Sequence, residues 1–239
     1  MIVHVFEKPE QASFAAAQLF AAALLKKPDS VLGLATGSTP IQTYKQLAQW
    51  HKEGLLDFSS AVSFNLDEYV GLTPDHPASY RQFMNEQLFD HINMLDTFVP
   101  SGVGEDMQEE CRNYDALIEE HGGIDIQFLG IGNNGHIGFN EPASDFSYGT
   151  QIVDLTPSTI EANKRFFDSV DDVPRQAISL GSGGIMRARQ IVLVALGEGK
   201  AEAVRQMVHG DVDPQCQASI LRLHPDVTVL LDEGAASLL

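Results

Sequence analysis

The sequence predicts an α/β fold: a doubly wound, mostly parallel sheet flanked by helices, of the Rossmann-like type. Short apolar runs alternate along the chain with longer segments that have helical periodicity. Several of these runs are followed at once by glycine and small polar residues, which is typical of strand ends that bind ligands. With 239 residues, of which 44% are hydrophobic, the chain is expected to form a single domain over residues 1–239.

The first half of the chain predicts four strands and four helices in alternation. The strands are short apolar runs at residues 3–6, 31–35, 61–64 and 124–129. The helices are expected at residues 13–27, 40–51, 79–89 and 108–121. The first helix is rich in alanine and ends before Pro28, and the second has Pro40 in its first turn, where proline is best tolerated.

The second half continues the same alternation. Strands are expected at residues 176–180, 190–196 and 227–231. Helices are expected to open after Gly181 and to span residues 200–209. Residues 143–175 are more polar and less regular, and we interpret them as a lid segment inserted within the domain.

Composition excludes several classes of protein. The net charge of −18 disfavours a nucleic-acid partner, because such a surface needs a basic face. The chain has no apolar run of about 18 residues, so no membrane span is expected. Cys111 and Cys216 are far apart, which argues against a disulfide framework or a cysteine-based zinc site. The N-terminus lacks a basic region before an apolar stretch, so no secretory signal is expected and a cytoplasmic location is predicted.

The first candidate site is the segment Thr36, Gly37, Ser38 and Thr39, which lies between a predicted strand and a predicted helix. Backbone N–H groups at a helix start, together with small hydroxyls, suit a phosphate or another anion. The segment is not a Walker A loop, because no Gly-Lys-Ser/Thr sequence follows at the required spacing. An ordinary turn, with Thr39 as the N-cap, explains the pattern equally well.

The second candidate is the acidic pair Asp67 and Glu68, which follows the strand at residues 61–64. A carboxylate at a strand end can act as a general base, although a solvated turn is the simpler reading of this pair alone. Adjacent side chains of a strand point to opposite faces. We therefore expect at most one of the two to face a ligand, while the other holds the loop.

The third candidate is the loop at residues 130–142, which carries His136 and Glu141. Its glycine spacing matches the dinucleotide-binding fingerprint, but that fingerprint requires a helix directly after the last glycine. Gly138 and Pro142 would break such a helix, so nicotinamide and flavin binding are excluded. Acid–base work by His136 with a carboxylate partner remains, beside a purely structural role for the loop.

The fourth candidate is a pair of cations, Lys200 and Arg165. Lys200 follows a strand and two glycines at the start of a predicted helix, where a bound phosphate would lie. Arg165 lies in the predicted lid and could close onto an anion. In so acidic a chain, an anionic ligand needs such local cations. The alternative for each is an ordinary solvated surface cation.

Taken together, these segments resemble the isomerising glucosamine-6-phosphate deaminases of the glucosamine/galactosamine-6-phosphate isomerase family. The resemblance rests on six stretches that occur in the expected order over nearly the whole chain: residues 33–40, 64–72, 76–80, 130–142, 162–167 and 196–201. It implies hydrolytic conversion of glucosamine 6-phosphate into fructose 6-phosphate and ammonium, in the catabolism of N-acetylglucosamine, with no metal or organic cofactor.

The resemblance also implies roles for individual residues. Asp67 matches the base that moves a proton between C2 and C1 of the opened sugar, His136 matches the group that assists ring opening, and Glu141 matches its carboxylate partner. The substrate phosphate site is matched by Thr36, Gly37, Ser38, Thr39, Arg165 and Lys200.

Two departures from the family pattern carry expectations. Asn134 stands where some relatives have an aspartate, so we expect it to support the histidine–carboxylate pair without acting as a base. Gln151, Val153 and Asp154 stand where relatives activated by N-acetylglucosamine 6-phosphate carry cations. The chain also stops soon after its last strand. We therefore expect no activation by that effector, and we favour a monomer over a homo-oligomer.

Two other functions are compatible with these sequence features. One is a 6-phosphogluconolactonase-like hydrolase, and the other is a non-catalytic module that senses a sugar phosphate. The intact sequence Phe139, Asn140, Glu141 and Pro142 favours the deaminase over the lactonase. The acidic balance and the start of the chain directly on a strand disfavour a sensor attached to a DNA-binding segment.

Overall fold

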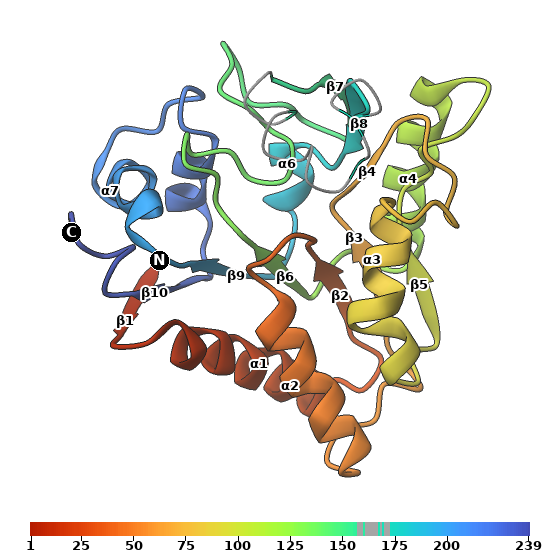
Figure 1. Cartoon of the computed structure of the whole chain (residues 1–239), viewed down its shortest axis with the longest axis horizontal. Helices are drawn as coiled ribbons and strands as arrows, with labels where there is room; N and C mark the ends of the chain where they lie inside the picture. Colours follow the sequence, from red (N-terminus) through yellow and green to blue (C-terminus); the bar gives the residue numbers. More distant parts are fainter. Residues whose placement is uncertain (157–159, 161–166, 168, 170–172) are drawn as a thin grey trace.

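A computed structural model describes residues 1–156, 160, 167, 169 and 173–239, and its main sheet has seven strands (Figure 1). All neighbouring strands in this sheet are parallel, as expected. From one edge to the other the strands are β1 (Ile2–Phe6), β10 (Val227–Asp232), β9 (Gln190–Ala195), β6 (Ile126–Leu129), β2 (Val31–Leu34), β3 (Val62–Asn65) and β5 (Asp96–Phe98).

Helices cover both faces of this sheet, which confirms the doubly wound arrangement. Among the described residues, the α-helices are α1 (Pro9–Lys26), α2 (Ile41–Lys52), α3 (Tyr80–Gln87), α4 (Met107–Glu120), α6 (Ser182–Ile185) and α7 (Ala201–His209). In the register of the sheet, Phe64 and Phe128 point to opposite faces. The Phe128 ring packs against Phe20 of α1 and Tyr44 of α2, with centroids 6.1 and 6.3 Å away. Phe64 packs against Tyr114 of α4 at 5.8 Å. Within the described ranges, no helix has the length and apolar character needed to span a bilayer.

A second, smaller sheet lies beside the carboxyl ends of the main strands (Figure 1). It contains β4 (Asp67–Tyr69), β8 (Gln176–Ser179) and β7 (Gln151–Asp154), and its pairs are antiparallel. The strand expected at residues 176–180 is therefore present as β8, but it does not extend the parallel sheet. Only Leu66 separates β3 from β4, so the chain passes directly from the large sheet into the small one.

Most predicted elements are present with small shifts in their bounds. The largest shift is in α1, which begins at Pro9 and not at residue 13. Pro9 suits the first turn of a helix, and the side chain of Gln11 accepts a hydrogen bond from the backbone N–H of Lys8 at 3.0 Å. Together they start the helix one turn earlier than the apolar pattern indicates.

Three strands were not predicted: β4, which follows β3 after one residue, and the two short strands β5 and β7. β5 has only three residues and pairs on one side, with β3. β7 pairs with β8 alone, and its side chains are partly or fully exposed. An edge strand needs no continuous apolar run, so neither segment carries the signal of a buried strand. β7 lies within residues 143–175, so part of the segment expected to form a lid is regular structure. Its role as a lid stays a prediction.

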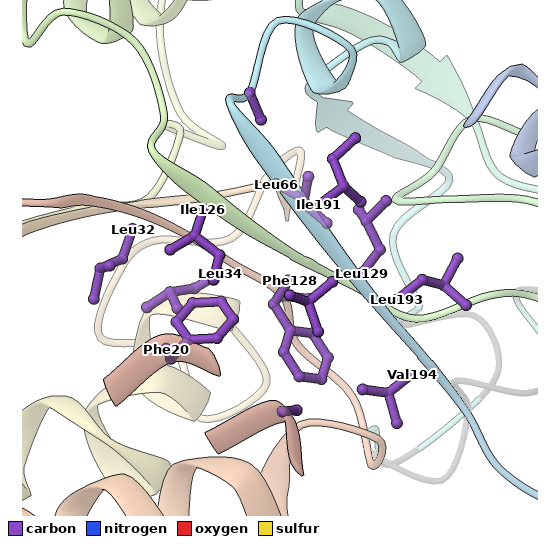
Figure 2. Close-up of a cluster of buried hydrophobic side chains, with 14 of the residues drawn as sticks. Phe20, Leu32, Leu34, Leu66, Ile126, Phe128, Leu129, Ile191, Leu193 and Val194 are labelled. Carbon is purple, nitrogen blue, oxygen red and sulfur yellow. The ribbon is translucent and has the colours of Figure 1, made fainter. Parts of the chain in front are cut away.

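The core joins the middle strands to α1. Figure 2 shows buried side chains on both faces of β2, β6 and β9, with Phe20 of α1 on the face of Phe128. They include Phe20, Leu32, Leu34, Ile126, Phe128, Leu129, Ile191, Leu193 and Val194. All of these side chains are at most 2% exposed. Dense packing of this kind holds the strand ends in fixed relative positions, so the loops that follow them start from a rigid base.

Candidate active site

The loops that follow β2, β3, β6 and β9 meet around one cavity of about 610 Å³. This agrees with the expectation that polar strand-end segments share the carboxyl edge of the parallel sheet. The predicted site residues that line the cavity are Thr36, Gly37, Ser38, Thr39, Asp67, Asn134, His136 and Lys200. Glu141 lies behind His136 and borders a neighbouring cavity of about 330 Å³. Arg165 lies outside the described residues.

The segment at residues 36–39 turns sharply between β2 and α2. Gly37 has a φ of +90°, a left-handed conformation that glycine adopts without strain. Pro40 occupies the N-cap position of α2, and no described side chain caps this helix start. The alternative reading with Thr39 as the N-cap is therefore wrong, because the helix begins one residue later. An uncapped helix start leaves backbone N–H groups and the positive end of the helix dipole available to an anion. The residues just before this helix, up to Thr39, line the cavity.

The acidic pair is divided between two tasks, as the alternation of a strand predicts. Asp67, which is 6% exposed, faces the cavity. Glu68 is 3% exposed, and its Oε1 accepts hydrogen bonds from the backbone N–H groups of Tyr69 and Tyr80 at 2.8 and 2.9 Å. Its Oε2 accepts from the N–H of Arg81 at 3.0 Å. Glu68 thus ties the start of α3 to β4, while Asp67 remains available to a ligand.

Burial changes the acidity of Asp67. Removal from water raises the pKa of its carboxyl group to about 8, and the nearby negative charge of Glu68 adds to this effect. A carboxylate with a raised pKa is a stronger base than an exposed one. Such a group near neutral pH is suited to accept a proton from carbon.

His136, Glu141 and Asn134 form a connected group in the loop after β6. Nδ1 of His136 lies 3.4 Å from Oε1 of Glu141, and Nδ2 of Asn134 donates a hydrogen bond to Oε2 of Glu141 at 2.7 Å. Oδ1 of Asn134 accepts from the backbone N–H of His136 at 3.3 Å. The carboxylate therefore sits between the imidazole and the amide. This is the geometry expected of a histidine with a carboxylate partner and a supporting amide, and their catalytic roles stay predictions.

Glycines allow this loop to pack closely. A Cβ atom at position 132 would lie 2.4 Å from the His136 ring, so only glycine fits beside the imidazole. Gly135 has a φ of +82°, and a Cβ there would lie 2.5 Å from Sγ of Cys216. Residues 130–142 contain no helix. The helix that a dinucleotide cradle needs after its last glycine is therefore absent from this loop, as predicted.

Lys200 reaches the same cavity from the loop after β9. It ends a 3₁₀ turn, Glu198–Lys200, and occupies the N-cap position of α7. Burial lowers the pKa of its ammonium group. A partly buried cation that lines a cavity favours an anionic ligand, because the ligand restores the interactions that burial removes.

The sequence assigned no role to two aromatic residues that line the cavity, Tyr80 and Phe139. Tyr80 is the first residue of α3, which Ser79 caps by accepting a hydrogen bond from the N–H of Gln82 at 3.0 Å. The capping serine was the available signal that a helix begins here. Among the described residues, no group of three or more histidine, cysteine, aspartate or glutamate side chains could hold a metal ion.

Comparison with known families assigns the chain. Residues 9–230 match the family model described as glucosamine-6-phosphate isomerases/6-phosphogluconolactonase. The chain belongs to this family. Members of the glucosamine-6-phosphate isomerase/6-phosphogluconolactonase family include two activities, so the particular relatives matter.

Two relatives that are more than 50% identical to the chain are both glucosamine-6-phosphate deaminases. A glucosamine-6-phosphate deaminase of Clostridium perfringens (strain SM101 / Type A) is 55% identical over 232 residues, which cover 96% of each chain. A glucosamine-6-phosphate deaminase of Halothermothrix orenii is 51% identical over 241 aligned positions, covering all of both chains. Within the glucosamine-6-phosphate isomerase/6-phosphogluconolactonase family, the chain is therefore similar to deaminases along its whole length.

Solved structures of the family show the same order of similarity. A structure described as a monomeric glucosamine-6-phosphate deaminase superposes with a TM-score of 0.96 at 45% identity over all of both chains. A 6-phosphogluconolactonase from Trypanosoma brucei has a TM-score of 0.75 at 20% identity, covering 100% of this chain and 98% of the other. The second likeness shows a shared fold and no more.

Proposed function

We propose that this protein is a glucosamine-6-phosphate deaminase, which converts glucosamine 6-phosphate and water into fructose 6-phosphate and ammonium in amino sugar catabolism. The observation that carries the proposal is a single cavity that brings together groups for acid–base chemistry and for anion binding. It is lined by the buried carboxyl group of Asp67 and by the imidazole of His136, which Glu141 contacts from behind. The loop before the uncapped helix α2 and the cation Lys200 line the same cavity. The similarity to deaminases at 51–55% identity supports it.

In the proposed first step, His136 opens the pyranose ring. It takes the proton of the hydroxyl on C1 and returns a proton to the ring oxygen, so that the C1–O bond of the ring breaks and an aldehyde forms. Glu141, 3.4 Å from the imidazole, stabilises the transient imidazolium. Asn134 holds the second carboxylate oxygen of Glu141 in place at 2.7 Å.

In the second step, Asp67 removes the proton from C2 of the open chain and delivers it to C1. The electron pair of the C2–H bond forms a C1–C2 double bond, and the oxygen on C1 takes a proton from the substrate's ammonium group, which gives an enolamine. Protonation at C1 by Asp67 then leaves a hydroxyl on C1 and an iminium at C2. Water then adds to C2, and the C2–N bond breaks to release ammonium and form the ketone. Proton transfer and imine hydrolysis balance without electron transfer, so these steps require no redox cofactor.

The phosphate is proposed to bind at the start of α2 through Thr36, Gly37, Ser38 and Thr39, with Lys200 and Arg165 as the cations. Anchoring this dianion offsets the unfavourable overall charge of −18 and places the other end of the sugar at Asp67. Residues 143–175 are proposed to form a lid over this site, and the protein is proposed to act in the cytoplasm.

The assignment is tested directly with purified protein and glucosamine 6-phosphate. Ammonium and fructose 6-phosphate should form in equal amounts. The same preparation should hydrolyse 6-phosphogluconolactone no faster than the buffer does. Lactonase activity without release of ammonium would overturn the assignment, and binding of the sugar phosphate without turnover would favour a sensor.

The rate should rise with pH through the ionisation of Asp67. The carboxyl group accepts a proton only when it is ionised, and its raised pKa places that transition near pH 8 in the free enzyme. A profile of kcat/KM between pH 5 and pH 9 should therefore show an ascending limb with a midpoint well above 4. A limb with its midpoint near pH 4, the ordinary range of a carboxyl group, would contradict this.

Replacing Lys200 with alanine should raise KM for glucosamine 6-phosphate by about 10- to 100-fold, since charge-assisted contacts to a phosphate are among the stronger hydrogen bonds. kcat should fall much less, because the lysine is proposed to bind the end of the substrate that does not react. Steady-state kinetics separate the two constants. Lys45→Ala, on the exposed part of α2, is the control and should change neither. An unchanged KM for the Lys200 variant would remove the residue from the phosphate site.

N-acetylglucosamine 6-phosphate is not expected to activate the enzyme. Gln151, Val153 and Asp154 line the neighbouring cavity of about 330 Å³, and the carboxylate of Asp154 accepts a hydrogen bond from Gln176 at 2.8 Å. Their side chains bring no positive charge to a phosphate. Velocity curves should be hyperbolic and unchanged by the effector. A sigmoidal curve that the effector converts to a hyperbola would contradict the expectation.

We further propose that the protein is a monomer. The support is its 45% identity and full-length superposition with a structure described as a monomeric deaminase. Sedimentation equilibrium over a wide concentration range should return a mass near 26.1 kDa throughout. A mass that rises to a multiple of this value would contradict the proposal.

A further inference from the structure

Tyr80 lies in the wall of the cavity to which the proposed function assigns the substrate. It lines the cavity together with Thr36 and Asp67. Its ring packs against that of Phe139, which lines the same cavity. Thr36 belongs to the proposed anion-binding loop and Asp67 is the proposed base, so the phenol shares the wall with the residues proposed for both ends of the substrate.

Two aromatic rings and one backbone hydrogen bond hold Tyr80 in place. Phe139 lies parallel to it, with an interplanar angle of 7° and centroids 6.0 Å apart. Tyr69 packs against it at 4.8 Å. Its backbone N–H donates a hydrogen bond of 2.9 Å to Glu68. A ring fixed in this way presents its hydroxyl group at a defined point of the cavity wall, as specific recognition requires.

The hydroxyl group keeps its proton throughout the working pH range, because burial raises the pKa of Tyr80 further above its ordinary value. Its Oη donates a hydrogen bond to the hydroxyl of Tyr69 at 3.3 Å. A phenol that donates in one direction still has lone pairs with which to accept in another. The group therefore suits an uncharged hydroxyl of a ligand better than a phosphate.

We propose that Tyr80 is a specificity-determining residue whose hydroxyl group hydrogen-bonds the hydroxyl on C3 or C4 of the sugar phosphate. The inference rests on the proposed function. With the phosphate on C6 at residues 36–39 and C2 at Asp67, the middle carbons of the open chain lie beside Tyr80. Of their hydroxyl groups, the one on C5 is the former ring oxygen and belongs to His136. The groups on C3 and C4 remain.

The test compares wild type, Tyr80→Phe and Tyr69→Phe on three substrates: glucosamine 6-phosphate and its 3-deoxy and 4-deoxy analogues. Tyr80→Phe keeps the ring and removes only the oxygen. Tyr69→Phe is the comparison variant, because it keeps the Tyr80 phenol and removes only the hydroxyl that accepts its hydrogen bond. Tyr80, and not Tyr69, is among the described residues that line the cavity. Thermal melts of the three proteins establish that each is folded.

Tyr80→Phe should lower kcat/KM for glucosamine 6-phosphate by about 10-fold, the usual effect of one neutral hydrogen bond. Wild type should lose a similar factor on one of the two deoxy analogues. On that analogue, wild type and Tyr80→Phe should have equal kcat/KM values, because the hydrogen bond is already absent when either partner lacks its hydroxyl. Tyr69→Phe should lose less than Tyr80→Phe and should still discriminate against that analogue, because the phenol proposed to contact the sugar is retained.

Two results would overturn the proposal. One is a Tyr80→Phe variant as active as wild type on glucosamine 6-phosphate. The other is a loss of the same size on all three substrates, which would indicate a general effect on the site and no contact with a particular hydroxyl. Failure of the proposed function is a separate result, since the wild-type protein itself would then release no ammonium in this assay.

Discussion

Replacing Asp67 with asparagine should lower kcat for glucosamine 6-phosphate by about 10²–10⁴-fold, the usual contribution of a positioned general base. Asparagine keeps the size of the side chain but accepts no proton from C2. The phosphate end of the substrate is proposed to contact other residues, so the variant should still bind it. Stopped assays of ammonium release give kcat, and isothermal titration with glucosamine 6-phosphate gives the affinity. Turnover close to that of wild type would remove Asp67 from its proposed role.

A second measurement on the same variant separates the chemistry from damage to the fold. Because the pKa of Asp67 is higher in the folded protein than in the unfolded chain, the folded state binds more protons between about pH 4 and pH 8. The free energy of unfolding contributed by Asp67 therefore falls as pH rises through that range. Asp67→Asn removes this loss, so the variant should be more stable than wild type at pH 8, by at most about 5 kcal/mol. Asp226→Asn, at an exposed position, should change neither stability nor kcat.

Replacing Glu68 with alanine should lower the free energy of unfolding by about 3 kcal/mol, because three backbone N–H groups lose a buried acceptor. Glu68→Gln keeps one acceptor oxygen and should lose less. Urea unfolding at pH 7, with both variants and wild type, measures the difference. A loss below about 1 kcal/mol for the alanine variant would show that water replaces the carboxylate at little cost.

Glu68→Gln should also change the pH profile. The negative charge of Glu68 contributes to the raised pKa of Asp67, so removing that charge should move the ascending limb of kcat/KM to lower pH. Burial remains the larger cause, and the limb should stay above the ordinary range of a carboxyl group. An unchanged limb would mean that the two carboxyl groups do not interact.

The convergence of the site on one edge of the sheet could be predicted from sequence. Parallel strands end at the same edge, so apolar runs followed by Thr36, Asp67, His136 and Lys200 imply that these side chains meet. The alternation of side chains along a strand also predicts that Asp67 and Glu68 point to opposite sides, and in the structure one faces the cavity and the other the start of α3. These are local rules that depend on neighbouring residues only.

The small sheet could not be predicted in the same way. β7, β8 and β4 come from three separated parts of the chain, and their pairing depends on contacts between residues far apart in sequence. The sequence assigned no role to Tyr80 for a related reason. Nothing in its immediate neighbours shows that Glu68 and Phe139 bring its ring to the cavity wall.

The single residue between β3 and β4 restricts how this chain can change in length. An added residue at Leu66 would reverse the side to which every following side chain of β4 points. Glu68 would then enter the cavity, and Asp67 would point toward the start of α3. Loss of a residue would have the same effect, whereas a pair of added residues would restore the parity but lengthen the step between the sheets. Insertions and deletions in this connection are therefore expected to be far more damaging than most single substitutions beside it.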